Sequence, residues 1–202
     1  MNKHLIVAIT GGFATGKTTV AKFIEDDGYP VIYTDLLAKE LMSNDKEVIN
    51  AIIDSFGRDA YKDDNSINTQ YLSNIVFSNL EQLDVLNRIV HPKVIELMEN
   101  RLYELVKSGN QLVFVESALI FETALEDGFD YIICVSCDPN IQIQRAMQRH
   151  NLSEEDALKR INSQIPIQKK EALADFTIKN NGSIDDLKQS TSLVLNIIKA
   201  SL

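Results

Sequence analysis

Short apolar runs alternate with stretches of helical periodicity along this chain. Between the runs, apolar side chains recur every three or four residues, as they do on one face of a helix. The runs themselves lie at residues 6–9, 29–33, 111–115, 130–136 and 175–179. Strands that alternate with helices are typical of a parallel sheet that is covered by helices on both faces. The pattern therefore predicts an α/β protein whose sheet has five parallel strands.

The first apolar run leads directly into a glycine-rich turn. Residues 11–18 fit the pattern G-x-x-x-x-G-K-[ST], and a helix-like stretch follows them. Glycines let backbone N–H groups wrap closely around a polyphosphate, and the start of the helix adds partial positive charge. Lys17 would reach the β- and γ-phosphates, and the Thr18 hydroxyl would bind Mg²⁺. The alternative is a chance glycine-rich turn, which the strand before the motif and the helix after it argue against. The predicted nucleotide-binding residues are Gly12, Phe13, Ala14, Thr15, Gly16, Lys17, Thr18 and Thr19.

The alternation of strands and helices stops between the second and third apolar runs. Residues 36–109 carry helical periodicity only, with breaks predicted at residues 57–68 and at His91-Pro92. A helical block between two strands of a parallel sheet is an insertion, and an insertion at this edge usually holds the acceptor of the transferred group. A further short helix is predicted within residues 119–128.

Polar residues stand where several of the predicted strands end. The carboxyl ends of parallel strands meet at the edge of the sheet where ligands bind. Asp35 follows the second strand and is a candidate general base for a substrate hydroxyl, with the N-cap of the next helix as the alternative. Glu116 follows the third strand and could hold Mg²⁺ through water, or make only a structural hydrogen bond. Asn181-Gly182 follow the fifth strand and could offer backbone groups to a nucleotide base, or be only a turn.

A helical hairpin is predicted after the fourth strand. Its first helix carries Arg145 and Arg149, which are four residues apart and therefore share a face. Two arginines on such a hairpin suit a lid that closes over a phosphoryl group, because charge on the γ-phosphoryl oxygens must be stabilised as the bond breaks. The alternative is a solvated face whose arginines pair with Glu154 or Glu155.

Composition narrows the possible partners and compartments. The chain has 202 residues, a hydrophobic fraction of 45% and a net charge of −9, so we expect a globular protein without a nucleic-acid partner. No apolar run approaches the roughly 20 residues of a bilayer span and no leader is apparent, so we expect no membrane association and a cytoplasmic location. Cys134 and Cys137 form C-x-x-C, which we interpret as one core cysteine and one loop cysteine and not as a redox or zinc site. No feature predicts an oligomeric state.

Taken together, these motifs resemble the dephospho-CoA kinase family. The matching stretches run in the family's order from residue 5 to about 182, and they are residues 10–21 and 31–41, Phe56-Gly57, His91-Pro92, residues 119–122, Arg145 with Arg149, Gln164, Ala174-Asp175 and Asn181-Gly182. The resemblance implies a three-layer α/β/α P-loop NTPase fold with an inserted helical substrate domain and a helical lid. It also implies an ATP-dependent kinase that phosphorylates the ribose 3′-hydroxyl of dephospho-coenzyme A, with Mg²⁺ as cofactor, in the last step of coenzyme A biosynthesis.

The same resemblance implies roles for individual residues. Asp35 would be the base that acts on the acceptor hydroxyl, which favours the catalytic interpretation over the N-cap. Arg145 would contact the phosphates of ATP, together with Arg149, and the Asn181-Gly182 turn would lie by the adenine. His91 and Glu122 would belong to the substrate side, with a turn histidine as the alternative for His91. The implied domains are a nucleotide-binding core of residues 1–34, 110–138 and 174–202, a helical acceptor domain of residues 35–109 and a lid of residues 139–173.

The chain departs from the family's pattern at four positions. Tyr33 stands where the family commonly has aspartate, so the first carboxylate of the family's pattern is missing. Ala14 replaces a frequent loop glycine, Ala118 replaces a frequent proline, and Glu116 stands where relatives often carry aspartate. None of these changes removes the P-loop lysine, the P-loop threonine or Asp35.

Two alternative functions stay open on the residues alone. The first is another small-metabolite or nucleoside monophosphate kinase with the same architecture, which would differ in its acceptor pocket. The second is a nucleotide-dependent regulatory switch. Against the switch, the sequence has neither an N-K-x-D motif that reads guanine nor a D-x-x-G motif after the third strand. The lid arginines and Asp35 also suit transfer better than switching.

Overall fold

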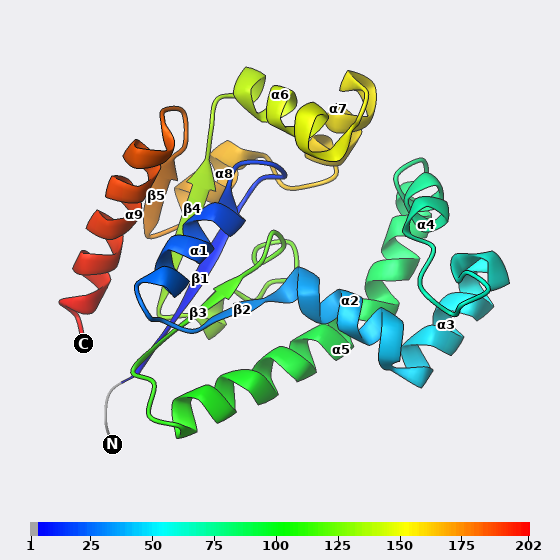
Figure 1. Ribbon diagram of the computed structural model, residues 1–202, viewed down its shortest axis with the longest axis horizontal. Helices are drawn as coiled ribbons and strands as arrows, with labels where there is room; N and C mark the ends of the chain where they lie inside the picture. The colour runs from blue at the N-terminus through cyan, green and yellow to red at the C-terminus, as the bar shows by residue number, and fades with distance from the viewer. Residues whose placement is uncertain (1–3) are drawn as a thin grey trace. The chain divides into compact units, whose positions relative to one another are not determined.

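The five apolar runs form one parallel sheet in the computed structural model, which describes residues 4–202 (Figure 1). Neighbouring strands pair in the order β2-β3-β1-β4-β5, and every pairing is parallel. The strands are β1 Leu5–Gly11, β2 Val31–Tyr33, β3 Leu112–Glu116, β4 Tyr131–Ser136 and β5 Phe176–Lys179. The central strand β1 leads into the glycine-rich turn, so that turn lies at the carboxyl edge of the sheet, between the ends of its neighbours. The prediction of a five-stranded parallel sheet is confirmed.

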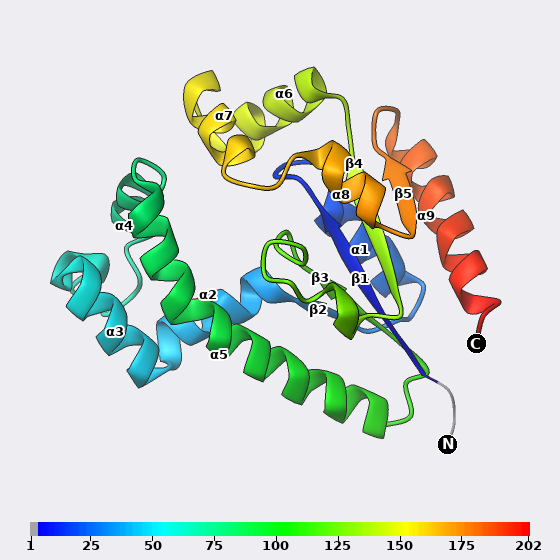
Figure 2. The ribbon, with the colours of Figure 1, turned by 180° about the vertical axis from the view of Figure 1, so that it is seen from behind.

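Helices cover both faces of this sheet, which gives three layers (Figures 1 and 2). On one face, helices α1 (Lys17–Asp26) and α9 (Ile184–Lys199) pack on a core that includes Val7 and Ile9 of β1. On the other face, Ala8 of β1 belongs to a second cluster with Ile120, Phe121 and Ile132, and helix α8 (Ile167–Leu173) contacts β1 and β4. Side chains alternate between the faces of a strand, so β1 contributes to both cores and its residues Val7–Ile9 have no exposed surface.

The predicted helical hairpin after β4 is present. Helix α6 (Pro139–His150) begins with proline at its first position, and helix α7 (Glu154–Asn162) follows after a turn at Asn151. The Ser153 hydroxyl accepts a hydrogen bond from the Asp156 backbone N–H and so caps α7. Whether this hairpin acts as a lid stays a prediction.

The chain divides into two compact units. The first unit holds the described residues up to Tyr33 together with Leu102–Leu202, and it contains the sheet, α1 and helices α6 to α9. The second unit, Thr34–Arg101, is entirely helical apart from its turns and one isolated antiparallel bridge. Its elements are α2 (Thr34–Asn44), α3 (Lys46–Phe56), the 3₁₀ turn η1 (Arg58–Ala60), α4 (Thr69–Val76) and the greater part of α5 (Leu80–Lys107).

Local capping explains where the helices of the second unit begin. The Asp45 carboxylate accepts hydrogen bonds from two backbone N–H groups of the first turn of α3, and the Asn68 side chain accepts one at the start of α4. Each helix then buries an apolar stripe, which includes Leu37, Val48 and Leu72. Among the described residues, none of the helices is apolar over a long enough stretch to span a bilayer.

Two local predictions are wrong. The break predicted at His91-Pro92 is absent, because α5 continues through Pro92. Proline removes one backbone hydrogen bond, and the helix-forming sequence on both sides outweighs that single loss. The short helix predicted from Leu119 is a series of turns followed by the 3₁₀ turn η2 (Glu126–Gly128). Ala124 adopts φ of 52°, in the left-handed region, so a right-handed helix cannot continue through it.

Candidate nucleotide-binding site

The backbone of the P-loop requires its glycines. Gly11 and Gly16 have φ of 145° and 104°, which L side chains rarely adopt. A Cβ atom on Gly11 would collide with the carbonyl of Val135 in β4, and one on Gly16 would collide with the side-chain amide of Asn180. The loop therefore lies against the ends of the neighbouring segments with no space for side chains at these two points.

Lys17 is folded back into the loop that precedes it. Its ammonium donates a hydrogen bond of 2.9 Å to the Gly12 carbonyl, and the side chain is buried. The Thr15 hydroxyl donates to the same carbonyl at 3.0 Å. Gly16, the N-cap of α1, has no side chain to cap the helix, and its carbonyl accepts a hydrogen bond from the Thr19 N–H. The start of a helix carries partial positive charge, so together with a buried ammonium it forms a site for an anion such as a polyphosphate.

The two acidic residues fall into different units. Glu116 is the last residue of β3, where it pairs in register with Ile9 of β1 and Tyr33 of β2, and it is 4% exposed. Asp35 is exposed and lies in the first turn of α2, which already begins at Thr34. The N-cap alternative for Asp35 is therefore wrong, because Asp35 lies inside the helix.

Tyr33 holds the end of β2 against helix α1. Its hydroxyl donates a hydrogen bond of 2.6 Å to the Glu25 carboxylate. Burial, followed by this bond and by the negative charges of Glu25 and Glu116, raises the pKa of the Tyr33 phenol. Tyr33 is therefore a neutral structural anchor in the first unit.

Arg145 is tied to the P-loop through an intermediate residue. Its guanidinium donates a hydrogen bond of 2.8 Å to the Asn180 carbonyl, and the Asn180 side chain donates one of 2.8 Å to the Thr15 carbonyl. Arg149, one turn further along α6, is exposed. The side chain of Asn181 bonds to the backbone and carboxylate of Asp138, at the start of α6. The end of β5 thus links the hairpin to the phosphate loop.

Glu122 makes contacts that sequence reasoning did not foresee. Its carboxylate lies 2.6 Å from the ammonium of Lys170 in α8 and accepts a hydrogen bond from the Ile165 N–H. Lys170 is completely buried and also donates to the Ala118 carbonyl at 2.6 Å. Burial lowers the pKa of the Lys170 ammonium, and the Glu122 carboxylate opposes that shift. The pair joins α8 to the turns after β3.

His91 lies in the second unit, in the middle of α5. The alternative of a turn histidine is therefore wrong. Its ring is half-buried, and burial lowers the pKa of His91, so the neutral imidazole predominates at neutral pH. A neutral imidazole can donate from one nitrogen and accept at the other.

The structure bears on both cysteines and on possible metal ligands. Cys134 and Cys137 are both free and buried, and burial raises the pKa of the Cys134 thiol to about 12, which makes it unreactive at neutral pH. Among residues 4–202, no group of three or more histidine, cysteine, aspartate or glutamate side chains could hold a metal ion.

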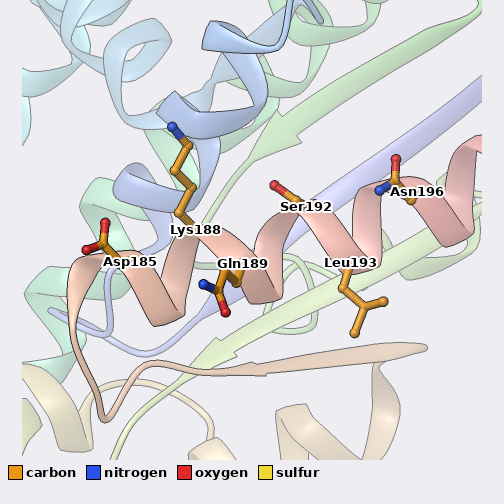
Figure 3. A pocket seen from close by; sticks show the side chains of 6 residues that line it. All are labelled: Asp185, Lys188, Gln189, Ser192, Leu193 and Asn196. Carbon is orange, nitrogen blue, oxygen red and sulfur yellow. The ribbon is translucent and has the colours of Figure 1, made fainter.

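One surface hollow lies away from the phosphate loop. It runs along the outer face of α9, and Figure 3 shows that its lining side chains all come from this helix. The lining residues are Asp185, Lys188, Gln189, Ser192, Leu193 and Asn196. None of them belongs to the P-loop or to the strand ends, so this hollow is separate from the nucleotide site.

Comparison with known proteins identifies the family. The family model described as dephospho-CoA kinase matches residues 5–186. A dephospho-CoA kinase of Bacillus thuringiensis subsp. konkukian is 36% identical over 191 residues, which cover 95% of this chain and 96% of the relative. The solved structure of dephospho-CoA kinase from Campylobacter jejuni superimposes with a TM-score of 0.71 at 29% identity, over 98% of each chain. The chain belongs to the dephospho-CoA kinase family.

Membership in the dephospho-CoA kinase family establishes the class of chemistry. The chain is an ATP-dependent kinase, and hence a transferase, of coenzyme A biosynthesis. Shikimate kinase from Acinetobacter baumannii, solved in complex with shikimate, is only 14% identical but superimposes with a TM-score of 0.54 over 99% of this chain and 96% of its own. That likeness concerns the fold alone, and it confirms the predicted P-loop architecture.

Sequence reasoning missed several residues around the loop. No sequence pattern indicated a role for Gln142, Arg160 or Lys170, and Gln164 was predicted only through the resemblance to dephospho-CoA kinases. The guanidinium of Arg160 in α7 lies 5.7 Å from the centre of the Phe13 ring, and both glutamines bond to the Phe13 backbone. No local pattern marks these residues, because their partners lie from 48 to 151 positions away along the chain.

Proposed function

We propose that this protein transfers the γ-phosphoryl group of ATP to the ribose 3′-hydroxyl of dephospho-coenzyme A, giving coenzyme A and ADP. The observation that carries this proposal is the P-loop, with the Lys17 ammonium buried inside a glycine turn at the start of α1. The family relationship supports the choice of acceptor.

In this proposal the phosphates of ATP lie against the loop and the first turn of α1. Backbone N–H groups of the loop, such as that of Ala14, donate to phosphate oxygens. The Lys17 ammonium keeps its hydrogen bond to the Gly12 carbonyl while its other N–H groups bind the β- and γ-phosphates. The Thr18 hydroxyl and the Glu116 carboxylate would hold Mg²⁺, Glu116 directly or through water. When bound, that ion neutralises charge on the β- and γ-phosphates. A buried carboxylate at a strand end and an exposed hydroxyl at a helix start provide the oxygen ligands that Mg²⁺ prefers.

The acceptor side is assigned to residues of the second unit. Asp35 would take the proton of the 3′-hydroxyl as that oxygen attacks the γ-phosphorus, and its exposed position in the first turn of α2 leaves the carboxylate open to a substrate. His91 would contribute hydrogen bonds to the acceptor. Glu122, which the resemblance places at the substrate, would act from the first unit.

Charge that develops during transfer would be stabilised by Arg145 and Arg149 of α6. Arg145 is held on Asn180, whose side chain bonds to the P-loop, so its guanidinium is anchored in the unit that carries the phosphates. The Asn181-Gly182 turn would lie by the adenine. In the proposed lid, residues 139–173 would close over ATP and exclude water, since water reaching the γ-phosphoryl group would hydrolyse ATP.

The net charge of the chain bears on the kind of substrate that we expect. With a net charge of −9 the surface repels a nucleic-acid backbone, so we expect substrates that are small and anionic and that are neutralised locally by the loop and the metal. We expect the protein to work in the cytoplasm.

A coupled assay of ADP release tests the proposal against its alternatives. Dephospho-coenzyme A should stimulate ADP release strongly, whereas adenosine monophosphate and shikimate should not. Stimulation by adenosine monophosphate would instead indicate a nucleoside monophosphate kinase. Slow release that no acceptor accelerates would indicate a regulatory switch. The Lys17→Ala variant serves as the control for contaminating kinases, because it removes the ammonium from the loop.

A further inference from the structure

The Phe13 backbone is held on both sides by glutamine side chains. The Phe13 N–H donates a hydrogen bond of 2.9 Å to the Gln164 side-chain oxygen, and the Phe13 carbonyl accepts one of 2.8 Å from the Gln142 side-chain nitrogen. Gln142 lies in α6 and Gln164 lies just after α7. The two ends of the helical hairpin therefore meet at one residue of the phosphate loop.

Packing shows that this arrangement is built into the loop. Gln142 is 4% exposed, and a Cβ atom on Gly12 would lie 2.7 Å from its side-chain nitrogen. The loop backbone therefore lies directly on the carboxamide. The Arg160 guanidinium lies 5.7 Å from the centre of the Phe13 ring and adds a contact from α7.

The two hydrogen bonds fix two consecutive peptide planes, because each peptide plane joins the carbonyl of one residue to the N–H of the next. Gln164 fixes the plane that contains the Gly12 carbonyl, which is the acceptor of the Lys17 ammonium and of the Thr15 hydroxyl. Gln142 fixes the plane that contains the Ala14 N–H. Gln164 thus holds the carbonyl that accepts the hydrogen bond of Lys17, and Gln142 sets the direction of the Ala14 N–H.

Ala14 explains why the second plane needs support. It adopts φ of 59°, in the left-handed region that an alanine rarely enters. A backbone in a disfavoured conformation persists only where its surroundings hold it. The hydrogen bond from Gln142 to the preceding carbonyl is one such restraint.

We propose that Gln142 and Gln164 are positioning residues for ATP: they bond to the Phe13 peptide groups and thereby aim the Ala14 N–H and the Lys17 ammonium at the polyphosphate. This inference rests on the proposed function, in which ATP lies on the loop. Neither glutamine needs to touch the nucleotide.

The first test replaces each glutamine by methionine, which has a similar length but makes no comparable hydrogen bond. We expect the KM for ATP and the dissociation constant of ADP to rise about five- to tenfold in Gln142→Met and in Gln164→Met. The KM for dephospho-coenzyme A should be unchanged, and kcat at saturating ATP should fall less than about twofold. Gln144→Met is the matched control, since Gln144 is an exposed glutamine on the same α6.

The second test uses the direction of the two hydrogen bonds. Gln164 accepts and Gln142 donates, so Gln164→Glu keeps an acceptor whereas Gln142→Glu turns an acceptor toward the Phe13 carbonyl. Both variants add the same charge close to the same loop residue. At pH 8 we expect Gln142→Glu to weaken ADP binding at least about tenfold more than Gln164→Glu does. Equal effects of the two glutamates would overturn the assigned geometry.

If the two glutamines had only a structural role, replacing them would lower the melting temperature but leave the ADP dissociation constant of the folded protein at the wild-type value. That result would overturn the inference. Gln164 is only half-buried, so its variants should fold even if those of the buried Gln142 do not. A wild-type protein without acceptor-dependent turnover would refute the proposed function instead, and ADP binding would still test the inference.

Discussion

The two units of the molecule place their charged side chains differently. The first unit buries Lys17, Glu116 and Lys170, and Lys170 has no exposed surface. Within the described part of the second unit, the ion pairs lie at the surface, with side chains that are 37–79% exposed. They are Arg88–Asp84, Lys93–Glu47, Lys93–Glu96 and Arg101–Glu40. Burying a charge is costly unless it is paired, whereas exposed pairs contribute little. The first unit therefore combines buried charges, one of them paired with Glu122, with exposed pairs such as Lys159–Glu155, whereas the ion pairs of the second unit are exposed.

The largest expected effects are on kcat and ATP binding, and they distinguish Asp35 of the second unit from Lys17 of the first. Asp35→Asn should lower kcat by about 10²- to 10⁴-fold, the usual contribution of a general base, and leave the ATP dissociation constant nearly unchanged. Lys17→Ala should weaken ATP binding and lower kcat together, because the ammonium contacts the phosphates in the ground state and in the transition state. Steady-state kinetics with nucleotide titration measure both. A near-normal kcat in Asp35→Asn would contradict the proposal that Asp35 is the general base.

The next effect concerns the stability of the first unit. Lys170→Met should lower the free energy of unfolding by about 3–5 kcal/mol, because it leaves the Glu122 carboxylate without its cation. Lys169→Met, a change at the exposed neighbouring position, should alter it by less than about 0.5 kcal/mol. Urea denaturation measures both variants. Adding Glu122→Gln to Lys170→Met should recover part of the loss, and similar losses at positions 169 and 170 would contradict the role given to the pair.

A smaller effect compares the backbones of the two units. Ala14→Gly should leave stability unchanged or raise it by up to about 1 kcal/mol, because Ala14 is held at positive φ. Ala38→Gly makes the same chemical change inside α2 of the second unit, where it should cost about 1 kcal/mol. Thermal unfolding, monitored by circular dichroism, gives the sign of the stability change in both variants. A loss at position 14 as large as that at position 38 would show that the loop is not strained.

The smallest effect is expected at the surface of the second unit. Arg101 and Glu40 form an ion pair of 2.8 Å, with side chains that are 47% and 45% exposed. A double-mutant cycle with Arg101→Ala and Glu40→Ala should give a coupling energy of about 0.2–1 kcal/mol, and added salt should reduce it. A coupling energy of several kcal/mol, close to that expected for Lys170, would erase the contrast between the units.

The sequence predicted those features that short stretches determine. The apolar runs marked all five strands, and the spacing of Gly11, Gly16 and Lys17 marked the phosphate loop with its flanking strand and helix. The end of the third apolar run also predicted the position of Glu116 at a strand end. Such features depend on periodicity and on local backbone sterics, and both can be read within a window of about ten residues.

Features that depend on distant partners could not be predicted. The Lys170–Glu122 pair joins positions 48 residues apart in sequence number, and the lysine resembles a solvated residue next to Lys169 and Glu171. The glutamines that hold Phe13 belong to the same class. The break wrongly predicted at Pro92 shows the opposite case, in which a strong local signal yields to the helical sequence around it.

The fate of the γ-phosphoryl group tests the central claim most directly. Phosphorus NMR of a reaction that contains equal amounts of ATP and dephospho-coenzyme A follows every phosphate at once. The account predicts one new phosphomonoester on the ribose 3′-oxygen, in the same amount as the ADP that is formed. Inorganic phosphate in place of that ester, or an unchanged dephospho-coenzyme A spectrum while ATP is consumed, would contradict it.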